Sequence, residues 1–199
     1  MTVKVGTICV TLLKEKNFLN KTSNNFVYTE TLGEIVINQC MTHVEDFLKS
    51  HNIQYALHEH PAVSTCEEAE KYCGNIPGLA CKNLLLRDKK GKRYFLVVLP
   101  AKKRSDLKEF AEIVGEGKVS FASPEALLEK LGIEKGAVSP FGLLNDTKHE
   151  VEVYVDREVY NADVVSFHPN RNTASLELSG EMFHKFLRAI ENKIKIIDL

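Results

Sequence analysis

Three polar features of this 199-residue chain have residue types suited to chemistry, and each lies where one predicted element gives way to the next. Lys82 and Asn83 stand at the start of an apolar run, where a lysine could hold an anion. The loop from Gly136 to Pro140 could present backbone N–H groups to a small polar molecule. His168 and Asn172 share a polar loop, and the imidazole could take up or release a proton. These three features are the candidates for a binding or catalytic site.

Lys82 is the most informative of these residues because of its neighbours. Cys81 precedes it, and the run from Leu84 to Leu86 follows Asn83, so the side chain emerges among apolar groups. Burying an unpaired ammonium is very costly, and the side chain therefore either reaches solvent or meets an anion. The sequence leaves both alternatives open.

The Gly136–Pro140 loop joins a residue free to adopt positive φ to one whose φ is fixed. Such a loop can expose backbone N–H and C=O groups in a fixed geometry, with little side chain in the way. The alternative is a tight connector between a helix and a strand, just as His168 can be an ordinary turn residue. The three residues inside the loop have small side chains: Ala137, Val138 and Ser139.

The common catalytic and cofactor signatures are absent from the sequence. There is no P-loop, no G-x-G-x-x-G opening a helix after a strand, no H-E-x-x-H and no G-x-S-x-G. The five cysteines form no C-x-x-C pair and are odd in number, so neither a zinc site nor a disulfide framework is expected. We therefore expect no metal, no cofactor and a reducing compartment.

The elements that position these residues follow from hydrophobic spacing and from capping residues. Helices are predicted over 42–51, 65–73, 106–114, 124–131 and 180–192, the second, third and fourth of them capped by Ser64, Ser105 and Ser123. Strands are predicted over 54–59, 81–87, 94–99, 119–121, 151–155, 164–167 and 174–178. Because helices are interspersed irregularly among hairpins, we expect an α/β fold with a mixed, largely antiparallel sheet surrounded by helices.

Composition and charge are those of an ordinary soluble protein, with 44% hydrophobic residues, 27% charged residues and a net charge of −1. No apolar run approaches the roughly 20 residues that cross a bilayer, so we expect a cytoplasmic protein without a membrane partner. Charge is uneven, because ten Lys and Arg stand against two Asp between Lys82 and Lys108, a balance of +8. This segment is either solvated surface or a phosphate-binding surface. The candidate cations are Arg87, Lys89, Lys90, Lys92, Arg93, Lys102, Lys103 and Arg104.

The first 40 residues differ from the rest of the chain. A short apolar stretch from Val5 to Leu13 is followed by charges and by an Asn/Thr/Ser-rich segment. The apolar stretch has no convincing cleavage site of a signal peptide. We predict an N-terminal extension over 1–40 and one compact domain over 41–199.

Four motifs together resemble the YbaK/prolyl-tRNA editing family in their order and spacing. They are His60-Pro61-Ala-Val before a Thr65-Cys-Glu-Glu helix start, Lys82-Asn83-Leu-Leu-Leu-Arg87, Gly136-x-x-x-Pro140 followed by Phe141-Gly-Leu-Leu-Asn-Asp146, and Phe167-His-Pro-x-x-Asn-Thr173. The resemblance is strongest to the free-standing alanyl-tRNA(Pro) deacylases of the ProX type. It covers about residues 42–192, nearly all of the compact region.

The resemblance implies hydrolysis of the ester that links a wrong amino acid to tRNA(Pro), with alanine as the expected amino acid. It implies that Lys82 holds the terminal adenosine phosphate or positions the substrate, and that the backbone of the Gly136–Pro140 loop engages the aminoacyl group. Asn83, His168 and Asn172 are implied as pocket residues. The family uses no metal, and the 2′-hydroxyl of the tRNA is implied to help position or activate the attacking water.

The expected partners are the acceptor end of tRNA(Pro) and prolyl-tRNA synthetase, whereas DNA and membranes are not expected. Cysteine or another small amino acid is an alternative substrate to alanine. A different kind of alternative is a non-catalytic module that binds tRNA or a synthetase through the same fold. The presence of both Lys82 and the intact loop favours the enzyme.

Overall fold

The computed structural model of the protein describes residues 3–5, 8–10, 43–63 and 66–199. Strands β1 (Val3–Val5) and β2 (Ile8–Val10) pair with each other in a small antiparallel sheet. Contacts divide the chain into two units, residues 1–31 and residues 32–199. The predicted boundary at residue 40 and the predicted cap Ser64 lie outside the described residues. In the part that is described, no helix is long and apolar enough to span a membrane.

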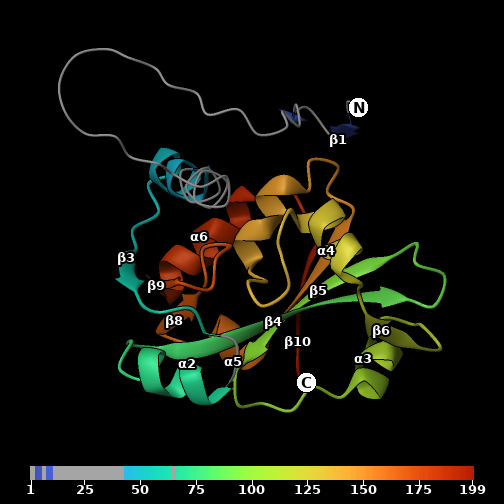
Figure 1. Cartoon of the computed structure of the whole chain (residues 1–199). Helices are drawn as coiled ribbons and strands as arrows, with labels where there is room; N and C mark the ends of the chain where they lie inside the picture. The colour runs from blue at the N-terminus through green and yellow to red at the C-terminus, as the bar shows by residue number, and fades with distance from the viewer. Residues whose placement is uncertain (1–2, 6–7, 11–42, 64–65) are drawn as a thin grey trace. The chain divides into compact units, whose positions relative to one another are not determined.

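The larger unit is built on a mixed sheet of eight strands (Figure 1). Along the sheet the strands follow the order β10-β7-β5-β4-β8-β9-β3, and β6 pairs with β4 beside this path. The pairs β4–β5, β4–β6, β8–β9 and β3–β9 are antiparallel, whereas β4–β8, β5–β7 and β7–β10 are parallel. This confirms the expected mixed sheet. The strands are β3 (Ala56–Glu59), β4 (Leu79–Asp88), β5 (Tyr94–Pro100), β6 (Val119–Phe121), β7 (Val151–Asp156), β8 (Val164–Phe167), β9 (Ala174–Ser179) and β10 (Ile194–Ile197).

Helices cover both faces of the sheet. Alternate residues of β5, from Phe95 to Leu99, belong to two different apolar clusters, and all of them are buried. A helix over residues 43–50, α4 (Pro124–Leu131) and α6 (Gly180–Ala189) pack on the first cluster, and α3 (Leu107–Ile113) packs on the second. Figure 1 shows α4 and α6 on one side of the sheet and α2 (Cys66–Cys73) with α3 on the other. Two covered faces explain why β5 is apolar throughout.

The helix ends follow local sequence signals. The Oγ atom of Ser123 accepts a hydrogen bond from the N–H of Ala126 at 3.3 Å, and α4 ends at Gly132, as its sequence predicted. Helix α3 begins one residue later than expected, because Asp106 rather than Ser105 is its N-cap. An Asp106 carboxylate oxygen accepts from the two N–H groups of the first turn, those of Lys108 and Glu109.

Several elements differ from the sequence-based expectations. Helix α6 ends at Ala189 instead of 192, and the four residues of β10 follow it unpredicted. The single-turn helix α5 (Arg157–Tyr160) and the 3-10 helix η1 (Pro140–Asn145) were not predicted either. The α5 and η1 segments are too short for a helical period to show in the sequence, and the four residues of β10 form a strand only beside β7.

Strand β4 has a break in its pairing that matters for the site. On the side away from β5, it pairs with β8 only at Leu79 and Ala80, and with β6 only from Leu86 to Asp88. Within the described part of the chain, residues 81–85 of β4 therefore have no strand partner on that side. We call this stretch the β4 break, and Lys82 and Asn83 lie in it.

Candidate active site

Lys82 and Asn83 point to opposite faces of β4, because side chains alternate along a strand. Leu84 packs with the second apolar cluster and Leu85 with the first, which places Lys82 on the face of the second cluster and Asn83 on that of the first. Lys82 is half-buried, and its ammonium donates to the carbonyl oxygen of Lys103. One donor of the ammonium is thus bound to a backbone carbonyl, which leaves two of its three N–H donors for solvent or an anion.

The turn that holds Lys82 is itself anchored. Lys103 Nζ lies 2.9 Å from Oδ2 of Asp156, which is buried at the end of β7. The same carboxylate accepts from the backbone N–H groups of Glu158 at 2.9 Å and Leu199 at 3.3 Å. A buried carboxylate with these partners fixes the turn, and with it the carbonyl that receives Lys82.

The Gly136–Pro140 loop approaches β4 through Asn83. Asn83 Nδ2 donates to the carbonyl oxygen of Val138 at 3.0 Å, so the loop is tied to the strand next to Lys82. Gly136 has φ of 94°, a left-handed conformation that residues with a Cβ rarely adopt, which confirms the expected use of its freedom. Ser139 is fully buried and caps η1, its Oγ accepting from the N–H of Phe141 at 3.2 Å.

Asn83 also offers an unused acceptor. Its Nδ2 must face the carbonyl of Val138, so the amide orientation is settled and Oδ1 points elsewhere. That oxygen is buried and accepts no hydrogen bond from any described residue. A buried acceptor without a donor costs about 1–3 kcal/mol. A ligand N–H or O–H, or a water, that reached Oδ1 would recover this energy.

His168 leaves the end of β8 with one ring nitrogen bound and the other available. Its Nδ1 lies 2.8 Å from the carbonyl oxygen of Ala174, which can only accept, so Nδ1 carries the hydrogen. In the neutral ring Nε2 is then an acceptor, and no described residue makes a hydrogen bond to it. Burial lowers the pKa of His168, the bond to Ala174 opposes that shift, and the charge of nearby His60 lowers the pKa further. The ring is therefore neutral at pH 7.

His60 and Ser175 are neighbours of His168 that the sequence did not single out as site residues. The His60 and His168 rings lie 5.7 Å apart between centroids, and His60 Nε2 lies 3.1 Å from Oγ of the buried Ser175. The register of β8 and β4 aligns Ser166 with Ala80. Because side chains alternate, His168 and Lys82, each two residues further on, belong to the same face of the sheet.

Asn172 has a more structural position than its motif suggested. Its Nδ2 donates to the carbonyl oxygen of Val63 at 3.3 Å, and its own carbonyl accepts from the N–H of Val63 at 3.1 Å. These bonds tie the 168–173 loop to the segment after β3. A role for Asn172 in substrate binding stays a prediction.

The nearby thiols are poor nucleophiles. Burial raises the pKa of Cys81 to about 12, and burial also raises the pKa of Cys73. A thiol at such a pKa carries almost no thiolate at pH 7. No group of three or more His, Cys, Asp or Glu side chains among the described residues could hold a metal ion.

The predicted cations fall into two groups at opposite ends of the β4–β5 hairpin. Lys102, Lys103 and Arg104 follow β5 and lie at the Lys82 end, with Lys102 and Arg104 exposed. The others lie at the hairpin tip: Arg87, Lys89, Lys90, Lys92 and Arg93. Strands rise about 3.3 Å per residue, so the two groups are roughly 20 Å apart.

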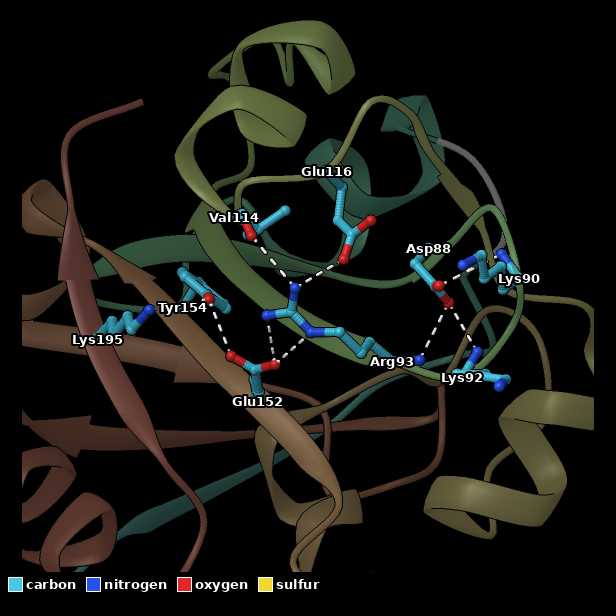
Figure 2. Close-up of polar contacts among 9 residues, drawn as sticks. All are labelled: Asp88, Lys90, Lys92, Arg93, Val114, Glu116, Glu152, Tyr154 and Lys195. Carbon is cyan, nitrogen blue, oxygen red and sulfur yellow. Dashed lines mark hydrogen bonds and ion pairs between the residues drawn. The ribbon is translucent and has the colours of Figure 1, made fainter.

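Arg93 is engaged within the protein, as Figure 2 shows. Its guanidinium binds Glu152 at 2.7 Å, Glu116 at 2.7 Å and the carbonyl oxygen of Val114 at 3.2 Å. These partners leave little of its charge for a nucleic acid. A surface hollow of about 410 Å³ lies elsewhere, between α5 and the start of α6, and none of the predicted site residues lines it.

The chain is similar to known proteins over most of its length. A family model described as an aminoacyl-tRNA editing domain matches residues 60–186. The prolyl-tRNA editing protein ProX of Acetoanaerobium sticklandii is 44% identical over 147 residues, which are 74% of this chain and 90% of that protein. A human protein named putative prolyl-tRNA synthetase associated domain-containing protein 1 is 37% identical and covers 65% of this chain, with 79% of its own length matched.

The fold is found in solved structures as well. A crystal structure described as a putative trans-editing enzyme for prolyl tRNA synthetase superposes with a TM-score of 0.62 at 22% identity, covering 80% of this chain and 97% of that one. An editing domain removes a wrongly attached amino acid by hydrolysing its ester to tRNA. The matched region contains Lys82, Asn83, the Gly136–Pro140 loop and His168. This chain therefore belongs to the aminoacyl-tRNA editing domain family and is a hydrolase of aminoacyl-tRNA esters.

Proposed function

We propose that the protein edits in trans, deacylating mischarged tRNA(Pro), and that alanyl-tRNA(Pro) is its preferred substrate. The names of the relatives, a prolyl-tRNA editing protein and proteins associated with prolyl-tRNA synthetase, support tRNA(Pro) as the nucleic acid. Prolyl-tRNA synthetase is then the enzyme that supplies the mischarged substrate, and the cytoplasm is where the two would meet.

The observation that carries the proposal is the arrangement at the β4 break. Lys82 enters it from one face of the sheet, and Asn83 ties the Gly136–Pro140 loop to it from the other. Strand β8 ends at the same place, where His168 follows. A cation, two acceptors without a donor among the described residues, and the Gly136–Pro140 loop thus surround one stretch of strand that has no strand partner on this side in the described part of the chain.

These groups have complementary tasks in ester hydrolysis. The two remaining donors of Lys82 would hold the phosphate of the terminal adenosine, and backbone N–H groups of the loop would stabilise the oxyanion. Asn83 Oδ1 would accept from the α-ammonium of the amino acid, which is the strongest donor of the substrate. The neutral His168 would accept a hydrogen bond from the attacking water through Nε2.

The reaction needs no side-chain nucleophile, because an aminoacyl ester is already activated. Water bonds to the carbonyl carbon, the bond from that carbon to the ribose oxygen breaks, and a proton from water ends on that oxygen. Placing water next to the ester and stabilising the oxyanion lowers this barrier without a covalent intermediate. The 2′-hydroxyl of the substrate would help to position the water, as the family resemblance implies.

Specificity would come from the size of the space beside the loop. A synthetase that must accept proline rejects alanine only weakly, because a few methylenes change binding by roughly 1–3 kcal/mol. Ala137 is buried and Val138 half-buried in the loop, and we expect these two side chains to limit the size of the amino acid that the site admits. Alanine would fit best and proline would be excluded, with cysteine as the nearest competitor.

The cations at the Lys82 end would hold the single-stranded end of the tRNA. Lys102 and Arg104 are exposed beside the turn that receives Lys82, within reach of the phosphates that precede the terminal adenosine. Lys103 serves this surface less directly, since its ammonium pairs with Asp156. Phosphate contacts of this kind weaken with salt.

The test is a deacylation assay with alanyl-, cysteinyl- and prolyl-tRNA(Pro) under the same conditions. We expect alanyl-tRNA(Pro) to be hydrolysed fastest and prolyl-tRNA(Pro) to decay at the buffer rate. Faster hydrolysis of cysteinyl-tRNA(Pro) would replace alanine by cysteine. If none of the three is hydrolysed while tRNA still binds, the protein is a binding module and the enzyme proposal fails.

A further inference from the structure

The tip of the β4–β5 hairpin is a rigid turn built around Asp88 (Figure 2). The Asp88 carboxylate accepts from the backbone N–H groups of Lys92 at 2.7 Å, Arg93 at 3.0 Å and Lys90 at 3.3 Å. Gly91 has φ of 66°, which lets the chain reverse within the turn. The backbone N–H groups, that of Arg93 foremost, hold the pKa of Asp88 below its usual value. The carboxylate is thus satisfied by backbone and leaves the lysine ammonium groups free.

Four exposed lysines gather at this turn, and we call them the hairpin-tip patch: Lys89, Lys90, Lys92 and Lys118. Lys118 joins the three from the turn because β6 pairs Val119 with Asp88, which brings the preceding residue beside Lys89. None of the four forms an ion pair with any residue in the described ranges.

The acidic side chains near the tip do not cancel this charge. Glu116 and Glu152 both bind the guanidinium of Arg93, and Tyr154 donates to Glu152 at 3.1 Å. Asp88 is buried and bound by backbone N–H groups. What the tip presents to a partner is therefore four ammonium groups on a preorganised turn.

The position of the patch determines which part of a tRNA it can reach. It lies roughly 20 Å from Lys82 along β4, too far for phosphates next to the terminal adenosine when that adenosine is at the β4 break. Lysine ammonium groups are point charges that suit phosphate contacts without reading bases. We propose that the hairpin-tip patch binds backbone phosphates of the double-helical stem of the substrate tRNA, as a second contact that is separate from the site for its 3′ end.

This inference rests on the proposed function for the identity of the RNA. It gives the two ends of the β4–β5 hairpin different roles. The Lys82 end would act on the aminoacyl terminus, and the tip would supply affinity that is independent of sequence. Losing the tip should therefore raise KM for a whole tRNA and leave kcat unchanged. A substrate too short to reach the tip should not respond at all.

The experiment compares two substrates and two variants. The substrates are alanyl-tRNA(Pro) and alanyl-adenosine, which contains only the terminal nucleoside and its ester. The tip variant is Lys89→Gln/Lys90→Gln, in which the backbone N–H groups bound to Asp88 are retained. The control variant is Lys49→Gln/Lys185→Gln, which removes one exposed lysine from the helix over 43–50 and one half-buried lysine from α6.

We expect the tip variant to raise KM for alanyl-tRNA(Pro) roughly five- to tenfold, and to lower the slope of log KM against log salt by about one to two. Its kcat, and its kcat/KM for alanyl-adenosine, should match the wild type, as should all values of the control variant. An unchanged KM for the tRNA, or equal losses with both substrates, would overturn the proposal. The same comparison made by binding uncharged tRNA(Pro) separates the two proposals, because weaker binding by the tip variant would support the patch even if no ester were hydrolysed.

Discussion

The tautomer and the protonation state of His168 are both fixed by the fold without a substrate. The carbonyl of Ala174 fixes its tautomer, burial keeps the ring neutral, and Nε2 has no hydrogen-bond partner among the described residues. A neutral imidazole with a free acceptor is suited to receive a hydrogen bond from water. The same ring, once protonated, would repel Lys82 on the same face of the sheet.

The pH dependence of His168 follows from the direction of its pKa shift. We expect deacylation to be constant above pH 7 and to fall only below about 6.5, because the folded-state pKa lies beneath that usual value. Stability should fall over the same range, since the unfolded chain takes up the proton first and the folded state gains it only at lower pH. Urea unfolding and single-turnover rates at pH 7.5 and 5.5 measure both effects.

Two variants of His168 separate its two nitrogens. His168→Asn places an amide near Nδ1, so the bond to Ala174 can persist while the acceptor at Nε2 is lost, and kcat should drop by about 10–100-fold. His168→Gln places an amide oxygen near Nε2 and should recover part of the rate. If His168→Asn retained the wild-type kcat, Nε2 would have no part in the reaction.

At the residue scale, the sequence predicted which residues belong to the candidate site better than it predicted which residues they contact. Lys82, Asn83 and Gly136 were recognisable because their chemistry contrasts with their neighbours. The contact of Asn83 with Val138 could not be predicted from the sequence, because it joins positions 55 residues apart. His60 and Ser175 were missed for the same reason, because they come together only through the pairing of β3 with β9.

At the scale of elements, η1 is the structure that holds the Gly136–Pro140 loop in place. Asp146 ends it, is nearly fully buried, and accepts from the N–H of Val151 at 2.9 Å and from Asn192 Nδ2 at 2.8 Å. The side chain of Asp146 thus joins the loop region to the start of β7 and to the segment before β10.

Replacing Asp146 should therefore destabilise the fold. We expect Asp146→Ala to lower the free energy of unfolding by about 2–4 kcal/mol, because buried donors of the backbone and of Asn192 would lose their acceptor. Asp198→Ala is the matched control: its carboxylate pairs with Arg157 in solvent, and its removal should leave the free energy of unfolding almost unchanged. Equal effects of the two substitutions in urea unfolding would refute this assignment.

The elements themselves were predictable where local signals are strong. The cap at Ser123 and the apolar run of β5 need no distant partner to be recognised, and both were predicted correctly. β10 was missed because its four residues form a strand only beside β7. Asp106 displaced Ser105 as a cap because a carboxylate accepts from two N–H groups at once.

At the scale of the whole molecule, the sheet explains why the site lies where it does. A parallel neighbour, β8, and an antiparallel one, β6, share the same edge of β4 and leave the β4 break between them. Neither the strand order nor the β4 break can be inferred from hydrophobic spacing, because that spacing carries no information about which strands pair. The excess of positive charge between Lys82 and Lys108 was visible in the sequence. That these cations form two groups roughly 20 Å apart is apparent only from the β4–β5 hairpin.

The central claim is that Lys82, held at the β4 break, acts in the hydrolysis of alanyl-tRNA(Pro). The direct measurement is single-turnover deacylation by the wild type, Lys82→Ala and the control Lys49→Ala, with urea unfolding of all three. We predict a loss of at least about 100-fold for Lys82→Ala at unchanged stability, and the wild-type rate for Lys49→Ala. A wild-type rate in Lys82→Ala would contradict the account.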